Sequence, residues 1–307
     1  MRCFEKLNKT VLGFGIAVAL TILLLSEPAL AAQKSDSPTS AKDFLRLGVG
    51  ALRQNNYPAA IKNFTQAIQR DKQYAPAYAN RCLAHLQQDN NQSAEQNCTQ
   101  ALQLNPDNTE AYLNRGLARY RLGEYQQAIA DCNALVKLKP DEFRAYYNRG
   151  LAHAALGEYQ QAIADYNQSL HQGSLPEPNL AMIHNNRGVA QLKLNHLQNA
   201  ISDFNQALQF HAANVGALYN RGRVFRQQGD YTSALQDFTQ VIQLVPNYAP
   251  AYFNRGLLRH QQGSPAAIAD LRKAAECFYA QGATNAYQRT RLLIQRINFV
   301  RSPQVVG

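Results

Sequence analysis

The sequence predicts an all-α fold in which helical hairpins stack into an elongated solenoid. Six copies of an Asn-Arg-Gly-like tripeptide recur along the 307 residues, at steps of 34, 34, 38, 34 and 34 residues. A period of this length is typical of stacked supersecondary units rather than of one globular core. Glycine and proline support the same fold, because Gly123 and Gly157 stand at expected tight turns and Pro106, Pro140 and Pro246 follow expected second helices.

Laid out in register, the sequence divides into seven units that each hold two expected helices. Their bounds are 41–74, 75–108, 109–142, 143–176, 181–214, 215–248 and 249–281. Residues 177–180 are a four-residue insertion, which we expect to lengthen the joint before the fifth unit and to bend the array. The seventh unit lacks one residue between Gly263 and Ala267.

Residues 282–307 are expected to form a capping helix and a tail. Such a helix covers the apolar face of the last unit and turns a polar face outward. The residues expected to cover that face are Tyr287, Leu292, Leu293, Ile297 and Phe299, and those expected to point outward are Arg289, Arg291 and Arg296.

The first 31 residues are typical of an export signal. Basic residues precede a charge-free apolar run, 11–25, and Ala29-Leu30-Ala31 offers small residues for cleavage before Ala32. The run is short for a bilayer span, which needs about 20 residues. An uncleaved anchor formed by residues 11–25 stays the alternative. In both cases the units, which follow a linker at 32–40, are expected outside the cytoplasm.

The charge of the chain is positive and unevenly distributed. Residues 32–180 carry 15 basic and 14 acidic groups, whereas residues 181–307 carry 13 and 5. A one-sided positive field favours an acidic partner or anionic lipid headgroups, although it can also serve solubility alone. Export argues against nucleic acid as the partner.

Four cysteines remain after the expected cleavage: Cys82, Cys98, Cys132 and Cys277. Three of them stand where the repeat needs small or apolar packing residues, so we expect buried thiols. An oxidising compartment would still permit pairing. If one pair forms, Cys82 and Cys98 are the candidates, because they face each other across one expected hairpin.

The placing of small, aromatic and proline residues resembles the tetratricopeptide repeat (TPR) family, whose 34-residue signature describes a helix-turn-helix unit. The third unit carries the pattern at Tyr112, Gly116, Gly123, Tyr125, Ala128, Cys132 and Pro140. The resemblance covers residues 41 to about 281 and implies a right-handed superhelix. Runs such as Tyr-Asn-Arg-Gly-Leu-Ala-His are similar to exported or membrane-associated TPR proteins of cyanobacteria, which by analogy suggests a periplasm or a thylakoid lumen.

The resemblance implies that the first helix of each unit lines a concave, ligand-binding groove. The asparagines of the tripeptide would form a line along it, because a side-chain amide can both donate to and accept from a peptide group. These are Asn80, Asn114, Asn148, Asn186, Asn220 and Asn254, and the other groove candidates are Leu117, Tyr147, Leu151, Tyr219, Phe253, Arg223 and Arg226. Alternatively, the asparagines serve contacts between helices and part of the apolar set belongs to the core.

The arginines of the tripeptide recur together with an aspartate on the second helix. The arginines are Arg115, Arg149, Arg187, Arg221 and Arg255, and the aspartates are Asp131, Asp165, Asp203, Asp237 and Asp270. This matched recurrence predicts structural ion pairs, since a guanidinium can hold a carboxylate through two parallel hydrogen bonds. We therefore expect these arginines to stabilise packing rather than to form a basic binding face.

Nothing in the sequence indicates catalysis, a metal site or a cofactor. No histidine has metal-ligand spacing with cysteine or glutamate, and no phosphate-binding glycine loop or nucleophile motif is present. We expect a non-enzymatic scaffold or adaptor that binds a protein or an extended, acidic peptide and assists assembly of an extracytoplasmic complex. The alternatives are a membrane-anchored structural protein and a non-catalytic subunit of an enzyme complex.

Overall fold

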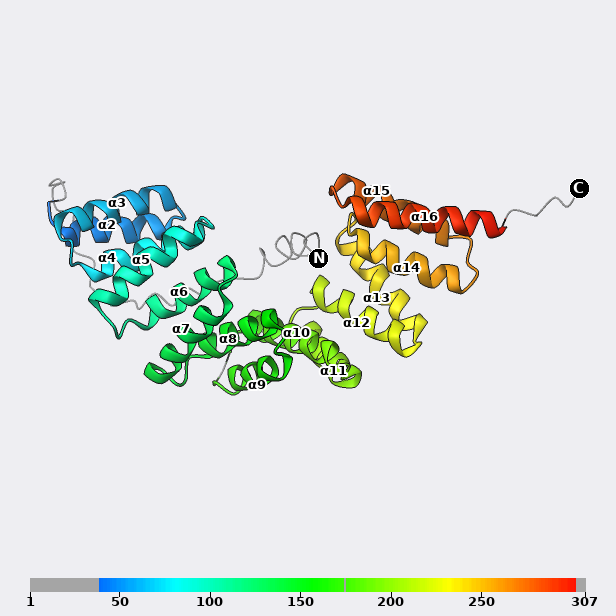
Figure 1. The fold of residues 1–307 in the computed structure, drawn as a ribbon, viewed down its shortest axis with the longest axis horizontal. Coiled ribbons are helices and arrows are strands. Elements are labelled where there is room, and N and C mark those ends of the chain that lie inside the picture. The colour runs from blue at the N-terminus through cyan, green and yellow to red at the C-terminus, as the bar shows by residue number, and fades with distance from the viewer. Residues whose placement is uncertain (1–38, 174, 302–307) are drawn as a thin grey trace, which may run out of the picture. The chain divides into compact units, whose positions relative to one another are not determined.

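The structure is a computed structural model that describes residues 39–173 and 175–301. These residues form fifteen α-helices and no strand, which confirms the predicted all-α fold (Figure 1). The expected export signal and its alternative, an anchor at residues 11–25, lie outside the described residues. Within the described part, no helix is both long and apolar enough to cross a membrane.

Consecutive helices pair into seven hairpins, which we number repeats 1 to 7. Second helices also contact the first helix of the next repeat, as α3 contacts α4, α5 contacts α6 and α7 contacts α8, and further along α11 contacts α12 and α13 contacts α14, so these neighbouring repeats hold one another. The pairs are α2 (Ala41–Arg53) with α3 (Tyr57–Arg70), α4 (Ala75–Gln87) with α5 (Asn91–Leu104), α6 (Thr109–Leu122) with α7 (Tyr125–Leu138), α8 (Phe143–Leu156) with α9 (Tyr159–Leu170), α10 (Glu177–Lys193) with α11 (Leu197–Phe210), α12 (Val215–Gln228) with α13 (Tyr231–Leu244), and α14 (Ala249–Gln261) with α15 (Ala267–Ala280).

The turn inside each repeat requires one residue with a left-handed backbone. Gly123 and Gly157 have φ angles of 84° and 83°, as predicted for these turns. Three repeats use asparagine or aspartate instead, the other residue types that adopt this conformation readily. These residues are Asn55, Asp89 and Asn195, with φ angles of 56°, 56° and 61°.

The four inserted residues 177–180 do not form part of the joint, which corrects our expectation. They are the first turn of α10, which has 17 residues where most first helices have 13 or 14. Pro178 fits there, because the first turn of a helix has no internal partner for its N–H groups. The joint is nevertheless longer than in other repeats, since α9 ends early, at Leu170.

Glycine and a large side chain face each other inside most hairpins. A Cβ atom built on Gly150 would lie 2.7 Å from the ring of Tyr166, and one on Gly222 would lie 2.9 Å from Phe238. Real Cβ atoms do not approach so closely, so the ring occupies the space that glycine leaves free. The same pairing joins Gly48 with Phe64, Gly188 with Phe204 and Gly256 with Leu271.

Repeat 2 departs from this pattern, and the expectation of buried free thiols is wrong for it. Cys82 and Cys98 stand at the two facing positions and form a disulfide. Cys132 and Cys277 are buried free cysteines, as expected. Burial raises the pKa of the Cys132 thiol to about 12, which keeps it protonated.

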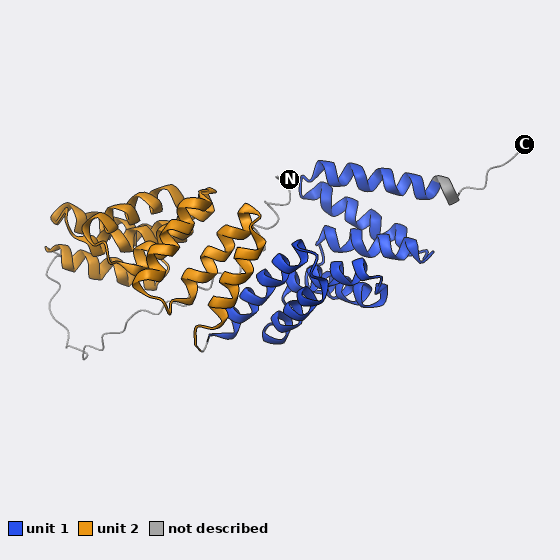
Figure 2. Cartoon of the chain, turned by 60° about the horizontal axis from the view of Figure 1, so that its bottom comes forward, with its two compact units in different colours: residues 1–18, 175–307 blue, residues 19–174 orange. Residues whose placement is uncertain are grey.

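The described chain divides into two compact units (Figure 2). One, the N-terminal unit, contains α2 to α9, and the other, the C-terminal unit, contains α10 to α16 (Thr284–Arg301). The boundary falls at residues 174 and 175, just before the inserted turn. A bend of the array at this point stays a prediction.

Helix α16 lies against α15 and covers the end of repeat 7. Ile297 is buried, and Tyr287 and Leu293 are half-buried. Leu292 does not cover the apolar face as expected, because 55% of it is exposed, and the side chain of Phe299 lies outside those described. Arg289, Arg291 and Arg296 are exposed, as expected.

Candidate binding surface

The first helices line the inner face of each unit. In the N-terminal unit α2 contacts α4, α4 contacts α6 and α6 contacts α8, and in the C-terminal unit α10 contacts α12 and α12 contacts α14. Among the described residues, the second helices make at most marginal contacts of this kind. Elements on the inside of a curved stack lie closer together than those outside, so we call the surface of the first helices the inner face.

Each arginine predicted to form an ion pair does so with its predicted aspartate. In repeat 3, Nη2 of Arg115 lies 2.6 Å from Oδ1 of Asp131, and Nε of the same arginine donates to the carboxylate. The corresponding N–O distances are 2.6 Å for Arg149 and Asp165, 2.6 Å for Arg187 and Asp203, 2.7 Å for Arg221 and Asp237, and 2.8 Å for Arg255 and Asp270. All five aspartates are buried, so these pairs belong to the interior. We call them clamp arginines and clamp aspartates.

Four clamp arginines, and Arg81 of repeat 2, also bind the preceding repeat, which the sequence-based prediction missed. Nη1 of Arg115 donates to Thr99, sixteen residues earlier, and Nη1 of Arg149 donates to Asn133 at the same spacing. Arg81, Arg221 and Arg255 make the equivalent bonds to Thr65, Asn205 and Thr239. A short polar residue at this place in each repeat was the signal in the sequence. Each of these five arginines therefore links two repeats rather than one hairpin.

Burial has two opposite effects on these ion pairs: it disfavours the ionised carboxylate, and it strengthens the attraction between the two charges. At Asp237 burial raises the pKa above its ordinary value, and the hydrogen bond and charge of Arg221 only partly oppose the rise. A buried ion pair gains little net stability, but removing one partner leaves a buried charge without compensation. The clamp thus fixes the geometry of the helices more than it stabilises the fold.

The asparagine line is only partly available to a ligand. Asn254 is buried, and its amide donates to the carbonyl of Pro250 and to the hydroxyl of Tyr219, at 2.8 and 3.2 Å. Both hydrogen bonds use the amide nitrogen of Asn254 inside the protein, and its ligand role stays a prediction. Asn80 is half-buried and likewise donates to the carbonyl four residues earlier, at 2.8 Å.

The other four asparagines are half-buried on the inner face. The Oδ1 of Asn220 accepts a hydrogen bond from Arg223 at 3.3 Å, and that of Asn186 accepts one from Asn185 at 3.2 Å. Asn114 and Asn148 make no hydrogen bond through their side chains with any described residue. These two are the members of the line best placed to meet a ligand.

The apolar groove candidates are half-buried and partly belong to the core. The ring of Tyr219 lies 5.9 Å from that of Phe238 and 5.3 Å from that of Tyr248. Burial raises the pKa of Tyr219. Phe253 similarly packs against Phe278, Tyr147 against Tyr166, and Leu117 against the core of repeat 2, while Leu151 is half-buried on α8. These side chains form the floor of the inner face rather than free anchors.

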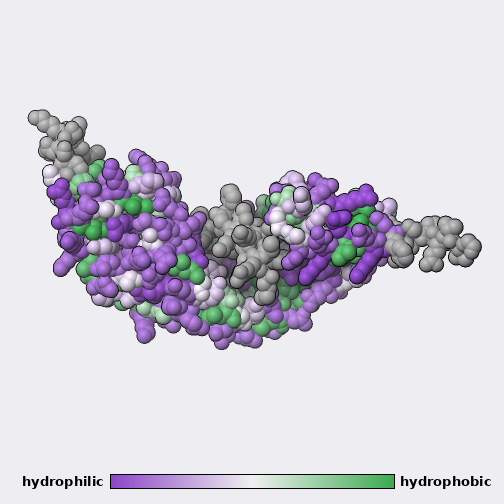
Figure 3. Space-filling view, turned by 45° about the horizontal axis from the view of Figure 1, so that its top comes forward, coloured by the Kyte–Doolittle hydropathy of each residue, from purple (hydrophilic) through white to green (hydrophobic). Residues whose placement is uncertain are grey.

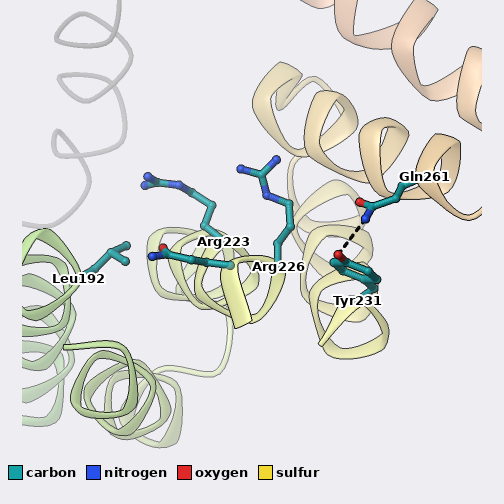
Figure 4. A pocket seen from close by; sticks show the side chains of 6 residues that line it. Leu192, Arg223, Arg226, Tyr231 and Gln261 are labelled. Carbon is teal, nitrogen blue, oxygen red and sulfur yellow. Dashed lines mark hydrogen bonds between the residues drawn. The ribbon is translucent and has the colours of Figure 1, made fainter. Parts of the chain in front are cut away.

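A cleft of about 390 Å³ lies beside α12, and we call it the Arg223–Arg226 cleft. Both arginines are exposed, and their guanidinium groups extend from α12 in the same direction (Figure 4). Neither forms an ion pair with a carboxylate of the described chain, and Arg223 lies over the ring of Tyr219, 5.8 Å from its centre. The wall is completed by Leu192, Gln227, Tyr231 and Gln261.

Repeat 6 differs from the other repeats at this place. The residue three positions after the tripeptide asparagine is Arg223 here, but is Leu83, Leu117, Leu151, Val189 or Leu257 elsewhere. Arg226 lies one turn further along the same exposed helix face. Two like charges at this spacing destabilise a helix slightly. Folding therefore gives no reason for the pair.

The rest of the surface offers no large apolar area on the side seen in Figure 3, where hydrophobic residues are scattered in small patches. Among the described residues, no group of three or more histidine, cysteine, aspartate or glutamate side chains is placed to hold a metal ion. Polar and charged contacts are thus the most distinctive feature of the candidate surface.

Comparison with known proteins identifies the same helical repeats as the structure. The tetratricopeptide repeat model matches residues 45–108, 80–143, 113–177 and 147–217, and a second TPR repeat model matches residues 222–263. A sequence comparison with curated proteins finds no match.

Several solved structures have a similar fold. A tetratricopeptide repeat protein of Parabacteroides merdae is 19% identical with a TM-score of 0.63, and the match covers 82% of this chain and 98% of that one. PilF of Pseudomonas aeruginosa is 20% identical with a TM-score of 0.59, over 69% and 94% of the two chains. PilW, a type IV pilus biogenesis factor, is 20% identical with a TM-score of 0.59, over 68% and 94%.

The family models together cover more than half of the chain, and the hairpins, their period and the turn glycines agree with them. Repeats of this kind are generally non-catalytic and form protein-binding scaffolds. The chain belongs to the tetratricopeptide repeat family.

Proposed function

We propose that this protein is a scaffold or adaptor that holds an acidic segment of a partner protein on the inner face of its C-terminal unit. The Arg223–Arg226 cleft is the observation that carries this proposal. Guanidinium groups form short, charge-assisted hydrogen bonds with carboxylates, and two of them side by side suit an extended segment with neighbouring acidic residues.

The charges of the C-terminal unit support an acidic partner. Its clamp aspartates are buried beneath the clamp arginines. Of the remaining acids, Glu177 lies in the first turn of α10, Asp230 caps α13 and Glu276 pairs with Lys273. Exposed arginines on α12 and α16 therefore carry positive charge with no carboxylate bound to it, which attracts an acidic segment and speeds its association.

We further propose that the protein assists assembly of a complex outside the cytoplasm, in a periplasm or a thylakoid lumen. The support is the expected export signal together with a similar fold in PilW, a pilus biogenesis factor. Two alternatives stay open. The protein can be a membrane-anchored structural element held by residues 11–25 and its basic C-terminal unit, or a non-catalytic subunit of an enzyme complex.

The acidic preference is tested with fluorescein-labelled extended peptides that differ only in a central Asp-Glu, Asn-Gln or Lys-Lys pair. The acidic peptide is expected to bind at least about tenfold more tightly than the amide peptide, because charge-assisted hydrogen bonds are worth about 1.5–3 kcal/mol. The double variant Arg223→Leu/Arg226→Leu should lose this advantage, since leucine is the usual residue at the first of these places.

The matched control is Arg289→Leu/Arg296→Leu on α16, which removes the same charge from an exposed surface away from the cleft. If both double variants weaken binding equally, net charge and not the cleft attracts the peptide. Binding of the unchanged protein to phosphatidylglycerol vesicles with no preference among the peptides would instead favour the membrane-surface alternative. Mild crosslinking and affinity capture of the exported protein would then identify its partner.

A further inference from the structure

One hairpin of the array is closed by a covalent bond where the others are closed by packing. Five repeats place a phenylalanine, tyrosine or leucine against glycine at the two facing positions, and repeat 3 places Cys132 against Gly116. Repeat 2 places Cys82 against Cys98 and joins them. Both cysteines are completely buried, so this bond lies at the centre of the α4–α5 hairpin.

Without the bond, this hairpin would be poorly packed. Two thiols cannot stay at bonding distance, so the sulfur atoms would have to separate inside a closed interior. They also offer less apolar surface than the ring that fills this place in repeats 1, 4, 5 and 6. The buried residues around the bond, contributed by α4, α5 and α6, are mostly alanine, namely Ala94, Ala101, Ala111 and Ala118 beside Leu86 and Leu102, and the larger Tyr78, Tyr112 and Leu117 are only partly buried against them.

The ionic clamp is also weaker in repeat 2. Arg81 donates at 2.6 Å to Asn97, a neutral side chain, where later repeats have an aspartate. Burial lowers the pKa of Arg81, and no carboxylate of the described chain pairs with it to offset the loss of solvation. The hairpin therefore lacks both devices that hold repeats 4 to 7 closed.

We propose that repeat 2 is the oxidation-dependent repeat of this protein, in which α4 and α5 form a stable hairpin only when Cys82 and Cys98 are joined. Two thiols give up two protons and two electrons to an oxidising disulfide, which becomes two thiols as the Cys82–Cys98 bond forms. A dithiol reductant reverses this exchange. Because both sulfur atoms are buried, exchange requires an open hairpin, and the state is set while the chain folds.

The effect should be confined to the first two repeats. Repeat 1 contacts the rest of its unit through α4, so it depends on repeat 2 for its place in the stack. Repeat 3 holds repeat 2 from the other side, because Arg119 binds Glu95 on α5 and Arg121 donates to the carbonyl of Leu86 on α4. Repeats 3 and 4 have their own clamps and stay folded.

The test is amide hydrogen exchange, read by mass spectrometry, on the full chain unfolded and then refolded either with oxidised glutathione or with dithiothreitol. Residues 41–104 of the reduced chain should exchange at least roughly tenfold faster than in the oxidised chain. Residues 175–301 should exchange equally in both and serve as the internal reference. Alkylation before digestion should find Cys82 and Cys98 joined in the oxidised sample.

Two double variants separate the bond from other effects of the reductant. Cys82→Gly/Cys98→Phe gives repeat 2 the pair found in repeats 5 and 6, and it should be protected with or without dithiothreitol. Cys82→Ala/Cys98→Ala should exchange rapidly in both. Equal exchange of residues 41–104 in the oxidised and reduced chains would overturn the proposal. So would loss of protection throughout the chain, or free thiols at both positions after oxidative refolding.

Discussion

Single residues of the recurring tripeptide have separate neighbours and separate tasks. The glycine faces a large side chain of the second helix, the arginine binds a buried aspartate, and the asparagine donates to its own helix or faces the inner surface. The arginine has the widest reach, because it bonds to two second helices at once. Substitutions at these three places should therefore have different consequences.

The glycines differ in the space around them, which predicts opposite effects for one substitution. A Cβ atom on Gly116 would lie 3.5 Å from its nearest neighbour, in ordinary contact, whereas one on Gly222 would lie 2.9 Å from Phe238. Gly116→Ala should raise the free energy of unfolding by about 0.5–1 kcal/mol through helix propensity. Gly222→Ala should lower it by about 1–3 kcal/mol through overpacking.

Urea denaturation followed by circular dichroism measures both glycine variants. A repeat array can unfold in a transition that is not two-state, so each variant is compared with the unchanged protein under the same conditions. A loss of stability in Gly116→Ala equal to that in Gly222→Ala would contradict the difference in space.

Asp131 holds two arginines, so its removal should be costly. Arg115 and Arg119 both lie on this carboxylate, at 2.6 and 2.9 Å. Asp131→Asn should destabilise repeat 3 by about 3 kcal/mol, because the half-buried charge of Arg115 loses its carboxylate partner and that of Arg119 keeps only Glu95. Hydrogen exchange of residues 109–138 measures the loss, and Asp141→Asn, at an exposed carboxylate, is the control. Equal protection in the two variants would mean that the clamp does not stabilise the repeat.

The sequence alone could predict the arginine–aspartate pairs, because both partners recur with the same period. It could not predict that Asn254 is buried, since this depends on the ring of Tyr219 in the preceding repeat. It also could not decide between two thiols and a disulfide at Cys82 and Cys98. That choice depends on how closely two helices approach, which a repeating pattern does not specify.

At the scale of elements, the joints between repeats carry interactions that the helices do not. Between α7 and α8, Glu142 is buried and binds Arg144 and Lys139, and Arg144 continues to Glu110 of the preceding repeat. Burial alone would raise the pKa of Glu142, but the hydrogen bonds from Arg144 and Lys139 outweigh it and place the pKa at about 2. This joint should be sensitive to acid.

The sign of that dependence follows from a folded-state pKa that lies below the ordinary value of 4.5. Glu142 contributes its full stabilisation above pH 4.5, and the contribution is lost as the pH falls towards 2. Glu142→Gln should be less stable than the unchanged protein at pH 7, and the difference should shrink between pH 4.5 and 2. Urea midpoints across this range measure it, and a difference independent of pH would contradict the ionised state.

The positions of the helices followed from the period and from turn residues, but their lengths did not. Residues 177–180 became the first turn of α10, although a four-residue insertion near Gly173 and Pro176 indicated a longer loop. An insertion close to one helical turn can extend a helix without rotating its apolar face out of register. The sequence contains no signal that separates these two outcomes.

At the scale of the whole molecule, the chain combines two units with different charge. The N-terminal unit is nearly neutral and contains the disulfide, and the C-terminal unit carries the surplus of arginine and the Arg223–Arg226 cleft. This division favours different partners for the two inner faces. An acidic segment should be attracted to the second and not to the first.

The mass of the exported protein tests the targeting prediction. A chain purified from the extracytoplasmic fraction of an expressing bacterium should begin at Ala32, because cleavage is expected after Ala29-Leu30-Ala31. Intact mass spectrometry measures this directly. Residue 1 retained in a membrane fraction would support the anchored alternative, and the full chain in the cytoplasm would contradict export.

Clamp arginines that bond both to their own repeat and to the preceding one have a consequence for how such an array can lengthen. Each of Arg115, Arg149 and Arg221 has a short polar partner sixteen residues before it and an aspartate sixteen residues after it. A duplication of one full period, wherever the gene is cut, regenerates both partners at the right distance. New repeats can thus enter the interior of the chain already joined to both neighbours, and the protein can lengthen its binding surface without inventing a new interface.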